Sequence, residues 1–103
     1  MEQQERIEQI LLSTGNVNKP YIIRDLIFVT ERVFIDIFDP NFDPNKALAD
    51  VAYQLKSKAF SYGATAVINC HFEHERINGE EGPFFEIFAY GTAVQFTQTT
   101  IGG

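Results

Sequence analysis

The chain of 103 residues carries a net charge of −6, with 45% apolar and 21% charged residues, an ordinary balance for one globular domain. Eight basic residues are spread among fourteen acids, so the sequence lacks the clustered Lys and Arg that bind nucleic acids and anionic membranes. We therefore expect a single domain over residues 1–103, with its core at about 10–96, and neither a nucleic-acid nor a membrane partner.

The N-terminal sequence and the cysteine content indicate the compartment. One cysteine cannot form an internal disulfide, and "MEQQERIEQILL" lacks the basic segment and apolar run of a secretory signal. No stretch approaches the run of about eighteen apolar residues that marks a membrane span. We expect a cytoplasmic protein.

The first half of the chain predicts strands. Residues 1–9 are compatible with a short helical turn or a frayed end, and a Ser-Thr-Gly-Asn turn follows "ILL". Residues 21–30 and 32–38 are rich in β-branched and aromatic types, which favour strands. A bulge or bend near Glu31 is expected to separate them.

The spacing of apolar residues predicts one long helix over residues 44–62. Asp43 is placed to cap its first amides, Pro44 suits the first helical position, and Gly63 suits the left-handed conformation that ends a helix. The apolar side chains recur at the spacing of one helical face, at Leu48, Val51, Ala52, Leu55, Ala59 and Tyr62.

The tandem "FDPNFDPN" at residues 38–45 offers oxygen donors that a calcium loop also uses. The fixed Asp and Gly positions of an EF-hand are missing, however, and Asp-Pro-Asn initiates turns. We interpret the repeat as turn chemistry, with its second copy capping the helix.

After the helix, residues 66–75 and 84–96 predict a hairpin joined by "RINGEEGP" at 76–83, whose Asn-Gly and Gly-Pro steps favour turns. The order of strands, helix and hairpin indicates an α+β domain, with one main amphipathic helix packed on a mostly antiparallel sheet.

The stretch "NCHFEHE", residues 69–75, holds the only cysteine and both histidines. Because side chains alternate along a strand, we expect two faces, one with Ile68, Cys70, Phe72 and His74, the other with Asn69, His71, Glu73 and Glu75. The first is expected to face the helix, which makes Cys70 a buried apolar side chain rather than a ligand.

The polar face is the candidate metal site. His71 with Glu73 and Glu75 could bind a divalent transition metal such as zinc, with His74, Cys70 and Glu86 as weaker candidates. A solvated, charged outer face explains the same residues and is favoured. Symmetry in an oligomer would repeat His71 or Glu73 and complete a site that one chain lacks.

Several segments together resemble the YbjQ-like family of small bacterial proteins, described as "putative heavy-metal-binding". They are "ILLSTG", "DLIFVT", "KAFSYGATAVINCHFE" and "AYGTAV", spread over residues 10–96; "GATAV" at 63–67 and "GTAV" at 91–94 are the most specific. The resemblance implies a dodecin-like subunit of a homo-pentameric ring and supplies no activity. Two departures are the Asp-Pro-Asn pair, which replaces a longer Gly- and Arg-containing segment, and Thr65, where the family typically has Asp.

Two functions remain as hypotheses. Ten Phe and four Tyr are more aromatic surface than so small a domain buries, which favours self-association, with Phe84, Glu86, Phe88 and Tyr90 packed against a neighbour. We therefore expect a non-enzymatic, homo-oligomeric binding or scaffold protein with a metal or small-molecule ligand. The alternative is a small hydrolase-like enzyme with His71 and Glu73 as acid and base; no catalytic motif supports it.

Overall fold

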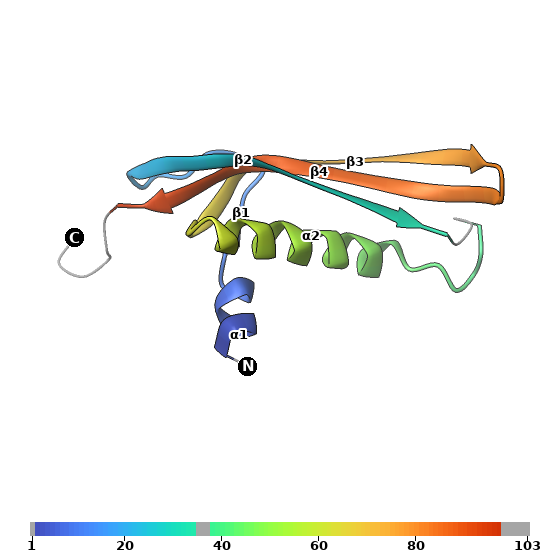
Figure 1. The fold of residues 1–103 in the computed structure, drawn as a ribbon, viewed down its shortest axis with the longest axis horizontal. Helices are drawn as coiled ribbons and strands as arrows, with labels where there is room; N and C mark the ends of the chain where they lie inside the picture. Colours follow the sequence, from blue (N-terminus) through green and yellow to red (C-terminus); the bar gives the residue numbers. More distant parts are fainter. Residues whose placement is uncertain (1, 35–37, 98–103) are drawn as a thin grey trace.

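The computed structural model describes residues 2–34 and 38–97. Its elements in chain order are α1 (Glu2–Glu8), β1 (Leu11–Leu12), β2 (Tyr21–Val33), α2 (Pro44–Ser61), β3 (Ala66–Gly79) and β4 (Gly82–Phe96). One long helix lies under a sheet, and the β3–β4 hairpin extends past the N-terminal end of that helix (Figure 1). The described residues include no helix that is long and apolar enough to cross a membrane.

The four strands form one sheet in the order β1-β3-β4-β2. Only the short β1 runs parallel to its neighbour, with Leu11 beside Ala66, while β3 and β2 both pair with β4 in antiparallel register. The predicted α+β fold with a mostly antiparallel sheet is confirmed.

Helix α2 begins and ends as the sequence predicts. Asp43 has an extended backbone, and its side chain accepts a hydrogen bond from the amide of Asn45 at 3.0 Å. Gly63 adopts a φ of +76° just after the helix. The buried side chains on the predicted apolar face are Val51, Leu55 and Ala59, whereas Leu48 and Tyr62 at its two ends are each 42% exposed.

The main core lies between α2 and the sheet. Residues 67, 87, 89 and 93 of the hairpin share this cluster with Ile27 and Val29 of β2 and with the buried side chains of α2. A smaller cluster, Ala66, Ile68 and Val94, lies on the opposite face of the sheet under Val17, Tyr21 and Phe96. We call the face that does not contact α2 the outer face.

The N-terminal segment is a helix, one of the two expected alternatives. Ile7 and the following Ile10 are 5% and 6% exposed, so this end of the chain is anchored by apolar burial. The ammonium of Lys56 on α2 also donates a hydrogen bond to the carbonyl of Glu8 at 3.0 Å.

Two strand predictions are corrected by the register. The irregularity in β2 falls at Arg24, between Ile23 and Asp25, and Glu31 pairs regularly with Ile87. The strand predicted over 32–38 ends at Val33; residues 35–37 lie outside the described part of the chain.

The hairpin turn is shorter than predicted. The strands continue through the expected 76–83 loop, with Ile77 opposite Phe84, and only residues 80 and 81 form the turn. Gly82 has a φ of +122°, a conformation that glycine adopts readily. Apolar pairing across the two strands therefore outweighs the turn preference of the Asn-Gly and Gly-Pro steps.

A β-bulge interrupts β3 at Asn69 and Cys70. Ile68 pairs with Thr92 and His71 with Tyr90, so two residues of β3 lie opposite Gly91 alone, the count that defines a bulge. Asn69 has a φ of +53°, which asparagine tolerates better than most residues. The predicted strict alternation is therefore wrong here: Ile68 packs on the outer face, whereas Cys70 belongs to the main core.

Candidate functional site

The three predicted metal-ligating residues all lie on the outer face of β3. His71, Glu73 and Glu75 are opposite Tyr90, Phe88 and Glu86 of β4, and all three side chains are exposed. The imidazole of His71 stacks on the Tyr90 ring, with centroids 5.1 Å apart. The sheet thus brings the donors onto one face, in a row along the strand.

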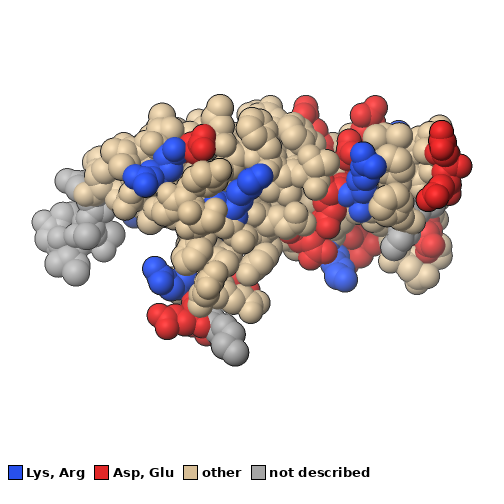
Figure 2. Space-filling model, in the orientation of Figure 1, with Lys and Arg blue, Asp and Glu red and all other residues tan. Residues whose placement is uncertain are grey.

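Glu86 extends this row onto β4. It lies directly opposite Glu75, an arrangement of like charges that is unfavourable by itself. The guanidinium of Arg32 on β2 offsets part of this repulsion through an ion pair with Glu86 at 3.2 Å. Figure 2 shows acidic side chains gathered on the half of the molecule that carries the hairpin turn.

Cys70 lies on the other side of the sheet and is 3% exposed. Burial raises the pKa of its thiol, an effect that a hydrogen bond involving the backbone of Ser13 partly opposes. The thiol donates to the carbonyl of Val67 at 3.4 Å. This environment suits an apolar core residue rather than a thiolate ligand.

His74 also faces the α2 side, away from His71. Its ring stacks on Phe85 at a centroid distance of 5.0 Å, beside a mainly apolar cavity of about 280 Å³ lined in part by Phe42, Leu48 and Phe72. The predicted separation of Cys70, Phe72 and His74 from His71, Glu73 and Glu75 is thus seen in the structure.

The donors of one chain do not converge on a point. Within residues 2–34 and 38–97, no group of three His, Cys, Asp or Glu side chains is placed to hold a metal ion. Successive same-face residues of a strand lie roughly 6–7 Å apart, so His71, Glu73 and Glu75 form a line of donors. The residue types suit zinc, but the arrangement within one chain does not complete a coordination shell.

A second feature of the outer face is its aromatic surface. Phe28 of β2 lies 6.3 Å from Phe88 and 6.4 Å from Tyr90 of β4, between ring centroids; we call these three residues the aromatic patch. Phe28 is 49% exposed although it lies near the middle of its strand. The shared face of Phe84, Glu86, Phe88 and Tyr90 was predicted, whereas the contribution of Phe28 depends on the β2–β4 register and was not.

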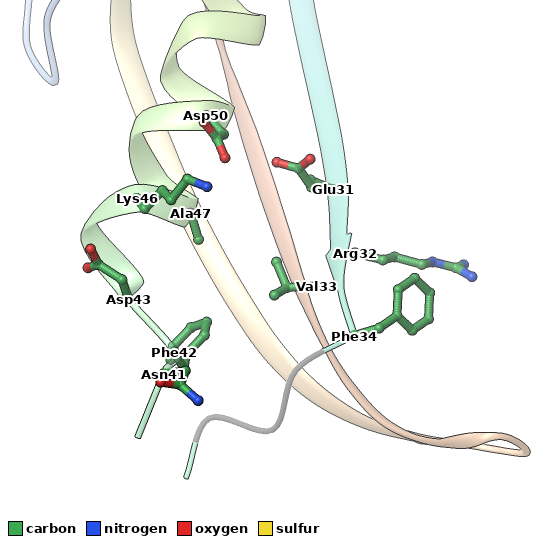
Figure 3. A pocket seen from close by; sticks show the side chains of 10 residues that line it. All are labelled: Glu31, Arg32, Val33, Phe34, Asn41, Phe42, Asp43, Lys46, Ala47 and Asp50. Atoms are coloured by element: carbon green, nitrogen blue, oxygen red, sulfur yellow. The ribbon is translucent and has the colours of Figure 1, made fainter. Parts of the chain in front are cut away.

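A cavity between β2 and the N-terminal half of α2 was not predicted from the sequence. It measures about 420 Å³, and the side chains of Glu31, Lys46 and Asp50 point into it (Figure 3). One carboxylate oxygen of Glu31 is buried and has no hydrogen-bond partner among the described residues. Glu31 and Asp50 are far apart in sequence, so only the fold brings their carboxylates to the same cavity.

The comparison with protein families identifies the chain. A family model for YbjQ, described as "putative heavy-metal-binding", matches residues 43–97. This chain belongs to the YbjQ family. The match spans α2, the bulge and both strands of the hairpin, and so includes the whole line of donors. The resemblance noted from the sequence is confirmed.

A solved structure supports the fold of this YbjQ chain. A protein of unknown function from Pediococcus pentosaceus, which belongs to the DUF74 family, superimposes with a TM-score of 0.72 at 20% sequence identity. The alignment covers 84% of this chain and 97% of that one. A comparison with curated proteins finds no match.

Proposed function

We propose that this YbjQ-family chain is a non-enzymatic, homo-oligomeric binding protein of the cytoplasm that associates through its outer face and binds a divalent metal ion there. The pentameric ring implied by the family resemblance is the expected assembly. The observation that carries the proposal is the exposed aromatic patch at the middle of the sheet, because apolar patches of this kind usually mark interaction sites.

The surface area of the isolated chain supports self-association. It exposes 7148 Å², whereas a compact monomer of 11.7 kDa is expected to expose about 5,900 Å². The excess, roughly 1,250 Å², is larger than the roughly 800 Å² that each partner buries in a standard interface. The elongated shape, 55 × 26 × 20 Å, contributes to this excess, because an elongated molecule exposes more surface than a compact one of the same mass.

The test of the assembly is the mass in solution. Light scattering at micromolar concentration is expected to find an oligomer, and Phe28→Asp is expected to shift it toward the monomer because a carboxylate would be desolvated in the interface. Leu48→Asp, which alters an exposed leucine of α2, is the control and should leave the mass unchanged. A monomeric wild-type protein would overturn the proposal.

The two histidines provide a matched test of metal binding. His71 and His74 lie close together on one strand but on opposite faces. Elemental analysis of untagged protein is expected to show bound metal in the wild type and in His74→Ala, and a loss in His71→Ala. Wild-type protein without metal above background would remove the metal from the proposal and leave the self-association intact.

The alternative function, a hydrolase-like enzyme, gains no support. The exposed His71 and Glu73 are not joined by a hydrogen bond in the described structure, and His71 packs flat against Tyr90. A general acid and base pair needs side chains aimed at a common substrate site. The hollow along this face is lined in part by Glu73, Glu75 and Glu86 but not by His71.

A further inference from the structure

Glu31 interrupts the apolar row on the α2 side of β2. Ile27 and Val29, the two preceding residues on this side of the strand, belong to the main core. Glu31 lies directly opposite Ile87, which is 1% exposed, and one oxygen of its carboxylate is buried and accepts no hydrogen bond from a described residue. An apolar side chain would cost less at this position. A buried polar group without a partner therefore calls for an explanation other than packing.

Three charged side chains point into the cavity beside this carboxylate. Glu31 on β2 and Asp50 on α2 face each other, and the ammonium of Lys46 is directed into the same space (Figure 3). Among the described residues, none of the three is in an ion pair. Lys46 and Asp50 are four positions apart on α2, but the basic residue comes first, which is the weaker order for a helical pair.

The other charged residues of the lining have partners elsewhere. Arg32 is directed away from the cavity (Figure 3) and pairs with Glu86 at 3.2 Å. Asp43 accepts the hydrogen bond that caps α2. The charges left to meet a ligand are thus two carboxylates and one ammonium, and this excess of negative charge favours a cationic ligand.

The size and the walls of the cavity indicate an organic cation. The cavity measures about 420 Å³, which is within the range of sites for small organic molecules. Nowhere in the described part of the chain are three carboxylate, imidazole or thiol groups placed to hold a metal ion. Val33, Phe42 and Ala47 add apolar surface beside the charged groups, and Phe42 is held by an edge-to-face contact with Phe85 at 5.9 Å.

We propose that this cavity binds a primary alkylamine, whose ammonium donates a hydrogen bond to Glu31 and is attracted by Asp50, and whose alkyl chain lies against Val33 and Phe42. The bound cation offsets the charge of a carboxylate that no described residue pairs, and a hydrogen bond between two charged groups is stronger than one between neutral groups. The site goes beyond the proposed function, because it lies on the α2 side of the sheet and needs neither the aromatic patch nor a second copy.

The site is tested by titrating n-butylammonium chloride into isotope-labelled wild-type protein at constant ionic strength, followed by the amide NMR signals. Saturable shifts are expected around Glu31 and Asp50, and none at residues 71–75 of the outer face. Tetramethylammonium, which has the same charge but no N–H donor, is the control ligand and should bind at least about tenfold more weakly. Shifts that do not saturate, or equal binding of the two cations, would overturn the proposal.

The apolar walls are tested by the length of the alkyl chain. From ethyl- to propyl- to butylammonium, the affinity is expected to rise roughly two- to fourfold per methylene, since full burial of one methylene corresponds to about a fourfold change. Equal affinities of the three amines would mean that the chain stays in water, and would overturn its contact with Val33 and Phe42.

Three variants test the charged residues. Glu31→Gln keeps the shape of the side chain and is expected to weaken butylammonium binding at least about tenfold, because it removes the charge from the acceptor. Glu80→Gln, the same change in the exposed hairpin turn, is the matched control and should bind as the wild type does. Lys46→Gln removes a competing cation and should strengthen binding roughly threefold, the effect of a charge repulsion screened by water. Unchanged binding in Glu31→Gln, or weaker binding in Lys46→Gln, would overturn the site.

Discussion

Gly91 lies directly against Val67: a Cβ added to Gly91 would stand 2.6 Å from Cγ1 of Val67 and 3.3 Å from the sulfur of Cys70. Gly91 faces the bulge of β3, where two residues share one partner. The close approach of the two strands at this point therefore depends on the missing side chain.

Gly91→Ala is expected to lower the free energy of unfolding by about 1–3 kcal/mol, the usual cost of overpacking a core. Urea denaturation followed by circular dichroism measures the change. Gly15→Ala is the matched control, because apart from its two chain neighbours no described residue has an atom within 4 Å of a Cβ built there. Equal stabilities of the two variants would contradict the packing role of Gly91.

The tandem Asp-Pro-Asn repeat allows a test of the helix cap. Asp43 accepts a hydrogen bond from Asn45 at the start of α2, and Asp39 makes the corresponding bond to Asn41 in a turn. Asp43→Ala is expected to cost about 1 kcal/mol because it removes an N-cap. Asp39→Ala should change the free energy of unfolding by no more than about 0.5 kcal/mol. A larger loss in Asp39→Ala than in Asp43→Ala would contradict the capping role of Asp43.

The thiol of Cys70 is expected to react slowly with an aromatic disulfide reagent in the folded protein. Burial raises its pKa, so less thiolate is present at a given pH, and the thiolate is the reactive form. The denatured protein should react at the rate of a free cysteine. Fast reaction of the folded protein would place Cys70 at the surface.

The same raised pKa has a consequence for stability. The unfolded chain loses the Cys70 proton at a lower pH than the folded chain does, because the pKa of the thiol is raised in the folded chain. The free energy of unfolding should therefore fall as the pH rises through the ordinary thiol pKa of 9.0. Urea titrations across this range, compared with those of Cys70→Ala, isolate the contribution of the thiol. A decline of the same slope in both proteins would show that other groups cause it.

Glu31 provides a test of the second cavity. Its buried carboxylate oxygen has no hydrogen-bond partner within residues 2–34 and 38–97, and an unsatisfied charged group is more costly than a neutral one. Glu31→Gln is therefore expected to raise the free energy of unfolding by about 1 kcal/mol, while Glu80→Gln in the exposed turn should leave it unchanged. A loss of stability in Glu31→Gln would mean that the carboxylate has a favourable partner.

The sequence predicted the parts of the fold that depend on local chemistry. Asp43, Pro44 and Gly63 marked the ends of α2 because caps are read from a few neighbouring residues. The turn at residues 80 and 81 was missed because the pairing of Ile77 with Phe84 is a contact between strands. Strand bulges at Arg24 and Asn69 likewise depend on partners distant in sequence.

The candidate site was predicted in part for a similar reason. The division of residues 70–75 between two faces follows from alternation within one strand, so it could be foreseen. The approach of Phe28 to Tyr90, and of Glu31 to Asp50, is set by the packing of separate elements. No short sequence motif predicts either of these contacts.

The bulge at Asn69 determines which side chains of the hairpin are exposed to solvent. Val67 is fixed toward α2, so an uninterrupted strand would continue in phase and send His71, Glu73 and Glu75 beneath the helix, with Cys70, Phe72 and His74 turned to solvent. One extra residue in the left-handed region shifts the phase by one position and reverses that outcome. The backbone conformation at residue 69, rather than the polarity of the residues that follow it, thus determines which of these residues face solvent.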